Sequence, residues 1–93
     1  MTRVVARIRI LPAEADSNLD EIIKALKIKI PHDMELNAHV KEPIAFGLHA
    51  IVGDFLIEDK EGQMDKLEES IKNTAGVGEI EVITISRKFV KSK

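Results

Sequence analysis

The spacing of apolar residues follows the same order twice along this chain, and that order restricts the folds that the chain can adopt. Residues 4–11 carry apolar side chains with a period of two, which predicts a half-buried strand, and Pro12 ends it. A stretch at helical spacing follows, with Ser17 or Asn18 as its N-cap and Pro31 after its last turn. The apolar stripe of this helix consists of Leu19, Ile22, Ile23, Leu26 and Ile30.

Alternation returns at residues 35–43 and predicts a second strand. A third strand is predicted at residues 48–58, a second helix from Met64 to Ala75, and a fourth strand at residues 79–87. The apolar face of the second strand is expected to carry Leu36, Ala38 and Val40. The core residues expected in the fourth strand are Ile80, Val82 and Ile85.

The predicted order is β-α-β-β-α-β in a single domain that covers residues 1–93. It predicts an α+β, ferredoxin-like sandwich with an antiparallel sheet of strand order 4-1-3-2 and both helices on one face. We also expect strands two and four to run in the same direction. The turn at 44–47 and the end of the fourth strand at 86–89 would then lie at one end of the sheet, about 14 Å apart at about 4.8 Å per strand.

Composition excludes several classes of protein. The formal net charge of −2 argues against a nucleic-acid-binding protein, which usually carries a strongly basic face. The absence of cysteine from the 93 residues excludes disulfides and thiolate metal sites. No apolar run reaches the roughly 20 residues that a bilayer requires, and the first residues lack the pattern of a secretory signal. We therefore expect a cytoplasmic protein that contacts neither membrane nor nucleic acid directly.

The chain offers no convincing catalytic or metal-binding set. There is no glycine-rich phosphate loop of standard spacing, and the acidic pairs fall where solvated charges belong. If the hairpin turn is centred near Ala45, His39 and His49 face each other across it, but two ligands alone make a weak metal site. Solvent-exposed polar positions on the sheet explain both histidines. The expectation is a protein without catalytic residues, metal or cofactor.

The turn between the second and third strands is unusual because it is apolar. Hairpins prefer short polar turns, yet this one reads Pro43, Ile44, Ala45, Phe46, Gly47. Two interpretations remain open from the residues alone: Phe46 contacts a partner protein, or it folds back over the open end of the core. Arg87 and Lys88 begin a cationic C-terminal segment, which is either a solubilising tail or a second contact.

At this turn the chain resembles a known family. Residues 42–48, which read EPIAFGL, are similar to the signature of the elongation factor 1-beta family. The resemblance extends to residues 7–12 in the first strand, 55–59 at the end of the third strand and 67–71 in the second helix. It therefore covers nearly the whole chain, and the short form looks like the archaeal branch of the family.

The resemblance implies a guanine-nucleotide exchange factor that performs no covalent chemistry and needs no cofactor. Its partner would be elongation factor 1-alpha, a GTPase on which GDP is replaced by GTP. The family's turn contacts the second domain of that partner, which implies the same role for Phe46 and, around it, Pro43, Ile44 and Gly47. A lysine near the C-terminus of eukaryotic members enters the Mg²⁺ and phosphate region, and the matching position here is Arg87 or Lys88.

Two other functions share the predicted fold. RNA-recognition domains stack bases on aromatic residues of strands one and three, but the first strand here has no aromatic residue and the third has only Phe55. A small-molecule-binding regulatory domain is the other alternative, and the fold itself does not exclude it. That alternative leaves the apolar turn at Phe46 without an explanation.

Overall fold

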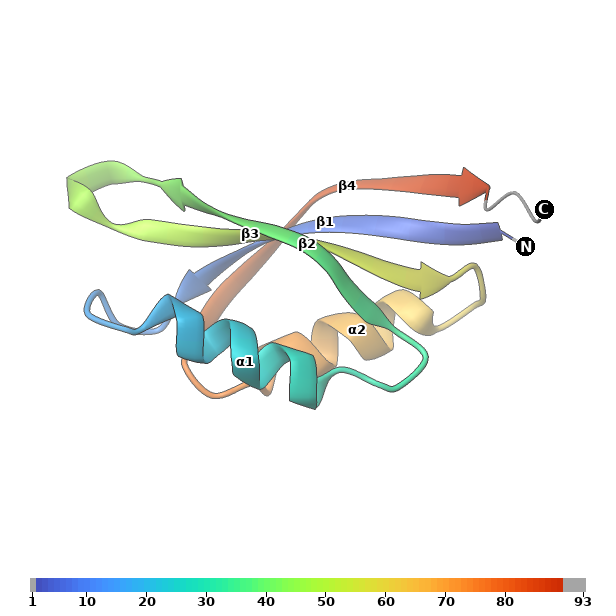
Figure 1. The fold of residues 1–93 in the computed structure, drawn as a ribbon, viewed down its shortest axis with the longest axis horizontal. Coiled ribbons are helices and arrows are strands. Elements are labelled where there is room, and N and C mark those ends of the chain that lie inside the picture. Colours follow the sequence, from blue (N-terminus) through green and yellow to red (C-terminus); the bar gives the residue numbers. More distant parts are fainter. Residues whose placement is uncertain (1, 90–93) are drawn as a thin grey trace.

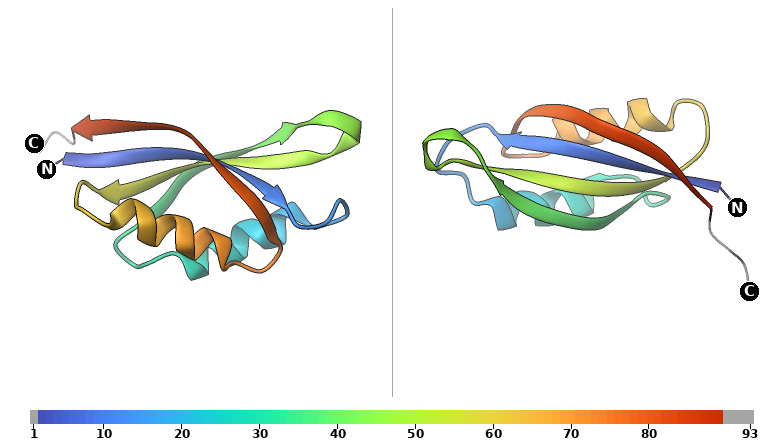
Figure 2. Two further views of the ribbon diagram at one scale, coloured as in Figure 1. Left: turned by 180° about the vertical axis from the view of Figure 1, so that it is seen from behind. Right: turned by 90° about the horizontal axis from the view of Figure 1, so that it is seen from above.

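In the computed structural model, the described part of the chain comprises residues 2–89, with side chains described for residues 3–87 (Figure 1). Four strands form one antiparallel sheet of order β2-β3-β1-β4, and the two helices cover one of its faces (Figure 2). This confirms the predicted ferredoxin-like α+β arrangement and its strand order. The elements are β1 (Thr2–Pro12), α1 (Leu19–Lys29), β2 (Glu35–Pro43), the short turn η1 (Ala45–Gly47), β3 (His49–Glu58), α2 (Gln63–Lys72) and β4 (Val77–Phe89).

Helix α1 begins and ends where local signals place it. Asn18, and not Ser17, is the N-cap: its side-chain oxygen accepts hydrogen bonds from the backbone N–H groups of Asp20 and Glu21 at 3.0 and 3.3 Å. The C-cap is Ile30, directly before Pro31. The residues of α1 that are buried against the sheet are Ile22, Ile23 and Leu26, as the apolar stripe predicts.

The core between helices and sheet is almost entirely aliphatic. Phe55 of β3 is its one aromatic member within the described residues, and it is fully buried. Phe55 faces the helices instead of solvent, so it cannot stack on an RNA base, and the structure does not support the RNA-recognition alternative. The fully buried large side chains around Phe55 are Ile8, Ile10, Leu26, Ile51, Ile57, Leu67 and Ile71.

The directions of the strands contradict one expectation. β1 pairs antiparallel with both β3 and β4, and β2 pairs antiparallel with β3, so β1 is parallel to β2 and β3 to β4. The prediction that strands two and four share a direction is therefore wrong. The physical reason is that each helix carries the chain back to the end where the preceding strand began, so the next strand runs the same way.

A β-bulge in β2 overturns the predicted face of that strand. Leu36 pairs with Phe55, but the next pair is Ala38 with Asp54, so Asn37 is an extra residue. Beyond the bulge, Ala38 and Val40 turn to the sheet face that no helix covers, and Val40 is 62% exposed. A second bulge lies in β4, where Ile83 is the extra residue opposite Arg7 and Ile8 of β1. Ile80 and Val82, before this bulge, are half-buried against the core, and Ile85, after it, is half-exposed.

Candidate partner-binding site

The turn at the tip of the β2–β3 hairpin has a left-handed backbone. Phe46 has φ 63° and ψ 31°, and Gly47 has φ 73°. The N–H of Leu48 donates to the carbonyl of Ala45 at 3.3 Å, and the N–H of Ile44 donates to the carbonyl of Leu48 at 2.8 Å. Positive φ at both central residues is the pattern of a type I′ turn, which fits the right-handed twist of the flanking strands.

Phe46 is an unfavourable residue for this turn on two counts. A left-handed backbone costs an L-residue with a bulky side chain about 1–2 kcal/mol, and the position usually carries Asn, Asp or Gly. The Phe46 ring is also 98% exposed, so it gains nothing from burial within this chain. The interpretation in which Phe46 folds back over the core is therefore wrong. Strain and exposure together favour a role outside the fold.

An apolar hollow lies beside this turn. Ile44 and Leu48, the residues that flank η1, are half-buried and line it together with the end of β1 and the loop after it. Its volume is about 440 Å³. The other lining residues are Leu11, Pro12, Ala13, Ala15, Gly78 and Glu79. The end of the molecule that carries Phe46 thus presents an exposed aromatic ring next to a largely apolar depression.

Arg87 lies near the end of β4, in register with Val4 at the beginning of β1. Its side chain is 71% exposed, and its Nε lies 3.1 Å from Oδ2 of Asp59, which follows β3. The backbone of Lys88 pairs with Arg3, whereas the side chain of Lys88 and residues 90–93 lie outside the described part of the chain. Of the two predicted contact residues at this end, the one whose side chain the structure describes, Arg87, is therefore already paired with a carboxylate.

The two predicted contact regions are not neighbours. β2 ends at Pro43, at the end of the sheet where β1 also ends, whereas β4 ends beside the beginning of β1. The β2–β3 hairpin accordingly projects from one end of the molecule, and the final residues of β4 lie at the other (Figures 1 and 2). The expected spacing of about 14 Å across one rim of the sheet is wrong. The molecule has principal extents of 45 × 21 × 21 Å, and the two regions occupy the ends of its long direction.

The histidine pair expected across the hairpin does not form. His39 is in register with Gly53, and His49 with Pro43, because the turn is centred on Phe46, whereas a pair of His39 with His49 requires a turn centred on Ile44. Among the residues that the structure describes, no group of three or more His, Asp or Glu side chains could hold a metal ion. No helix within residues 2–89 is long and apolar enough to span a membrane.

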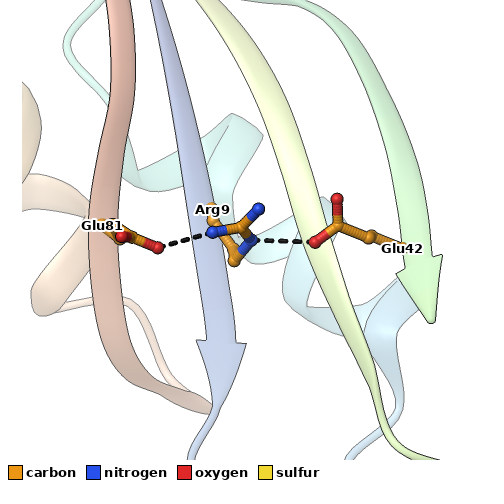
Figure 3. A network of polar contacts seen from close by, with 3 residues as sticks. All are labelled: Arg9, Glu42 and Glu81. Atoms are coloured by element: carbon orange, nitrogen blue, oxygen red, sulfur yellow. Dashed lines mark hydrogen bonds and ion pairs between the residues drawn. The ribbon is translucent and has the colours of Figure 1, made fainter. Parts of the chain in front are cut away.

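The uncovered face of the sheet carries a set of ion pairs that the sequence analysis missed. Arg9 of β1 donates from Nε to Oε1 of Glu42 at 2.8 Å and from Nη1 to Oε1 of Glu81 at 2.6 Å (Figure 3). Both hydrogen bonds raise the pKa of the Arg9 guanidinium, and the bond to Glu42 has the larger effect. The available signal was the pair of arginines at alternating positions of the first strand, Arg7 and Arg9.

Arg7 makes a further ion pair on this face. It donates from Nε and Nη2 to the two carboxylate oxygens of Asp54 at 2.8 and 3.2 Å, a bidentate geometry. The hydrogen bond from Arg7 lowers the pKa of the Asp54 carboxyl below its ordinary value, and partial burial of Asp54 opposes this effect. The pair links neighbouring strands β1 and β3 in the middle of the sheet.

Comparison with known proteins finds a family model and several relatives that match nearly the whole chain. Residues 5–87 match the family model described as the EF-1 guanine nucleotide exchange domain. Elongation factor 1-beta of Hyperthermus butylicus is 41% identical over 88 residues, which cover 94% of this chain and 96% of that protein. Elongation factor 1-beta of Methanocella arvoryzae is 37% identical over 89 residues, covering 96% and 100%. The protein of the same name from Methanothermobacter thermautotrophicus is 38% identical over 87 residues, covering 94% and 98%.

Proposed function

Since the chain belongs to the family of the EF-1 guanine nucleotide exchange domain, we propose that it promotes the exchange of GDP for GTP on elongation factor 1-alpha. In this proposal it acts by contact with that GTPase in the cytoplasm and makes or breaks no covalent bond. The observation that carries the proposal is Phe46, an aromatic ring that is 98% exposed on a left-handed turn. A residue that opposes both folding and solubility at its position is best explained by a partner that covers it.

The end of the molecule around Phe46 supplies affinity. Transfer of an exposed Phe side chain into an apolar pocket of the partner contributes about 1.5–3 kcal/mol. Pro43, Ile44 and Gly47 shape the backbone on either side of the ring, and the apolar hollow beside Ile44 enlarges the surface that can be covered. We assign this contact to the second domain of the GTPase, following the role of the turn in the family that the sequence resembles.

The opposite end supplies the effect on the nucleotide. GDP is held in a GTPase largely through its phosphates and a Mg²⁺ ion, which is the largest local charge in such a site. Arg87 and Lys88, at the end of β4, would approach this site and disturb the metal. When they do so, Arg87 exchanges its ion pair with Asp59 for contacts in the partner.

The thermodynamics of exchange require only that the factor bind the nucleotide-free GTPase better than the GDP-bound form. A 10³-fold weakening of GDP binding corresponds to a coupling free energy of about 4 kcal/mol, and GDP then weakens binding of the factor equally. Contacts made by Phe46 persist in every nucleotide state and cannot produce this difference. The difference therefore has to come from the end that carries Arg87 and Lys88.

The two ends are too far apart to act on one small region of the partner. A molecule with a long dimension of 45 Å can instead bridge two separate surfaces of the GTPase, one at each end. This bridging arrangement replaces the expected arrangement in which both features lie on one rim. It retains the separate roles of affinity at Phe46 and nucleotide release at Arg87 and Lys88.

The experiment that tests the proposal is release of a fluorescent GDP analogue from elongation factor 1-alpha, with and without this chain. We expect release to accelerate at catalytic amounts of the chain. Phe46→Ala should raise the concentration of factor needed for half-maximal acceleration, whereas Arg87→Ala and Lys88→Ala should lower the maximal rate. No acceleration at stoichiometric amounts of the folded wild-type chain would reject the function.

A further inference from the structure

The part of the hairpin that carries Phe46 extends beyond the rest of the sheet. The last β1–β3 pair is Ile10 with Ile51, whereas β2 and β3 remain paired through Glu42 with Ala50 and Pro43 with His49. This segment, which we call the ribbon (residues 42–50), projects past the helical layer (Figure 1). Two-stranded ribbons are marginally stable in water and twist readily. The direction of the Phe46 tip therefore depends on whatever fixes the base of the ribbon.

One ion pair fixes the base from the uncovered face of the sheet. Arg9 reaches from β1 to Glu42, although β3 lies between their strands (Figure 3). The residue of β3 opposite Glu42 is Ala50, which is small and fully buried, so the guanidinium can pass over it. Arg9 also holds Glu81 of β4, which restrains the guanidinium from the other side. We call this contact the open-face pair.

A second ion pair fixes the base from the helical face. Lys41 precedes Glu42, so its side chain points to the opposite side of β2. Its Nζ lies 2.9 Å from Oδ1 of Asp20, in the first turn of α1. The hydrogen bond from Lys41 is also the main reason that the pKa of Asp20 is lowered. We call this contact the helix-face pair.

We propose that the open-face pair and the helix-face pair together position the ribbon and hold the Phe46 ring in the direction required for partner binding. The inference rests on the proposed function, in which Phe46 contacts the GTPase. The two pairs join adjacent residues of β2 to different layers of the fold, so movement of the ribbon toward either face stretches one of them. Arg9 and Lys41 are thus positioning residues that act through Phe46 and do not themselves touch the partner.

The open-face pair is the more protected of the two. The side chains of Arg9 and Glu42 are 30% and 39% exposed, compared with 47% and 70% for Lys41 and Asp20. Ion pairs weaken with exposure to water and salt, so we expect the larger effect from Arg9. The chain offers a matched control in Arg7, which lies on the same strand and face but binds Asp54 within the middle of the sheet.

A first experiment needs no partner. Backbone ¹⁵N relaxation measures the order parameters of the Phe46 and Gly47 amides in the wild type, Arg9→Ala and Arg7→Ala. We expect Arg9→Ala to lower them from about 0.85 toward about 0.6, and Arg7→Ala to leave them unchanged. Glu42→Gln, which removes the charge but keeps the shape, should give the same result if Arg9→Ala does not fold. Unchanged order parameters in folded Arg9→Ala and Glu42→Gln would overturn the inference.

A second experiment separates positioning from general stability by a double-mutant cycle. Arg9→Ala should weaken binding to elongation factor 1-alpha about three- to tenfold, and Arg9→Lys should restore part of the loss. In the Phe46→Ala background Arg9→Ala should have no further effect, because the ring through which it acts is gone. An equal loss in both backgrounds would contradict the positioning role. If the wild type does not bind the GTPase, the proposed function fails, and the relaxation measurement alone decides the positioning of the ribbon.

Discussion

Phe46 and Arg87 lie at opposite ends of the sheet, because β2 runs parallel to β1 and β4 runs antiparallel to it. Both residues are exposed, and neither contributes to the core. A protein contacted by both residues must offer two surfaces separated by a distance comparable with the 45 Å length of this molecule. A GTPase with more than one domain meets that requirement.

This separation predicts that the effects of the two ends can be measured independently. In elongation factor 1-alpha truncated to its nucleotide-binding domain, Phe46→Ala should leave GDP release by the chain unchanged, because the surface that the ring covers is missing. Arg87→Ala should still slow release from the truncated protein by about tenfold or more, the effect of losing a well-placed charge contact. The measurement is stopped-flow release of a fluorescent GDP analogue. A Phe46→Ala effect of equal size on both forms of the GTPase would contradict the assignment.

Replacement of Phe46 should affect stability and binding in opposite directions. Phe46→Asn places a residue that tolerates a left-handed backbone before Gly47, so the free energy of unfolding should rise by about 1 kcal/mol and Tm by about 4–8 °C. The same variant should bind the GTPase at least tenfold more weakly, since it loses the aromatic contact. Calorimetry and a binding titration measure the two effects. Ile28→Ala is the control: Ile28 is 85% exposed on α1, and we expect neither quantity to change appreciably.

The pair formed by Arg7 and Asp54 predicts part of the pH dependence of stability. The pKa of Asp54 is lowered in the folded state, so its contribution is fully present above about pH 4, the ordinary value for Asp, and disappears as the pH falls through the lowered value. Arg7→Ala should therefore lose less stability than the wild type on acidification from pH 7 to below pH 3. Urea unfolding at both pH values measures this. A ¹³C titration of the Asp54 carboxyl should show its pKa rising in Arg7→Ala.

Two glycines with similar backbones should respond differently to substitution. Gly62 and Gly76 have φ of 84° and 88°, so an Ala at either position adopts an unfavourable left-handed conformation. At Gly62 the added methyl group meets no atom within 4 Å, and we expect a loss of about 1 kcal/mol. At Gly76 the methyl group would lie 2.9 Å from Cγ1 of the buried Ile22, and we expect a further loss of about 1–3 kcal/mol. Urea unfolding measures both losses of stability. If the two variants lost equal stability, Ile22 and helix α1 would have moved away from the added methyl group at position 76 at no cost.

Local sequence signals predicted the elements of this fold well. The N-cap, predicted at Ser17 or Asn18, and the helix end before Pro31 depend on neighbouring residues only, and the structure has the cap at Asn18 and the end at Ile30. The order of strands and helices followed from the change of apolar spacing, and the right-handed crossover led to the observed strand order. The same crossover rule also implies parallel first and second strands. The expectation that strands two and four share a direction contradicts this parallel arrangement and is therefore wrong.

Features that depend on distant residues were not predictable in the same way. The unbroken alternation of Leu36, Ala38 and Val40 contains no sign of a bulge, which forms where β2 adapts to β3. The composition of the turn left two positions for Phe46, and only the backbone conformation and the 98% exposure of the ring decide between them. The contact of Arg9 with Glu42 crosses an intervening strand, so no spacing in the sequence indicates it.

The bulge at Asn37 has a consequence for charge. Because one extra residue is inserted there, every later residue of β2 faces the opposite side from the one that simple alternation assigns to it. If Asn37 did not bulge and instead took the place opposite Asp54, Lys41 would turn toward Arg9, and Glu42 toward Asp20, so that cation would meet cation on one side and anion would meet anion on the other. The bulged conformation of one residue in an edge strand thus decides whether the base of the hairpin is attracted to its surroundings or repelled by them on both sides at once.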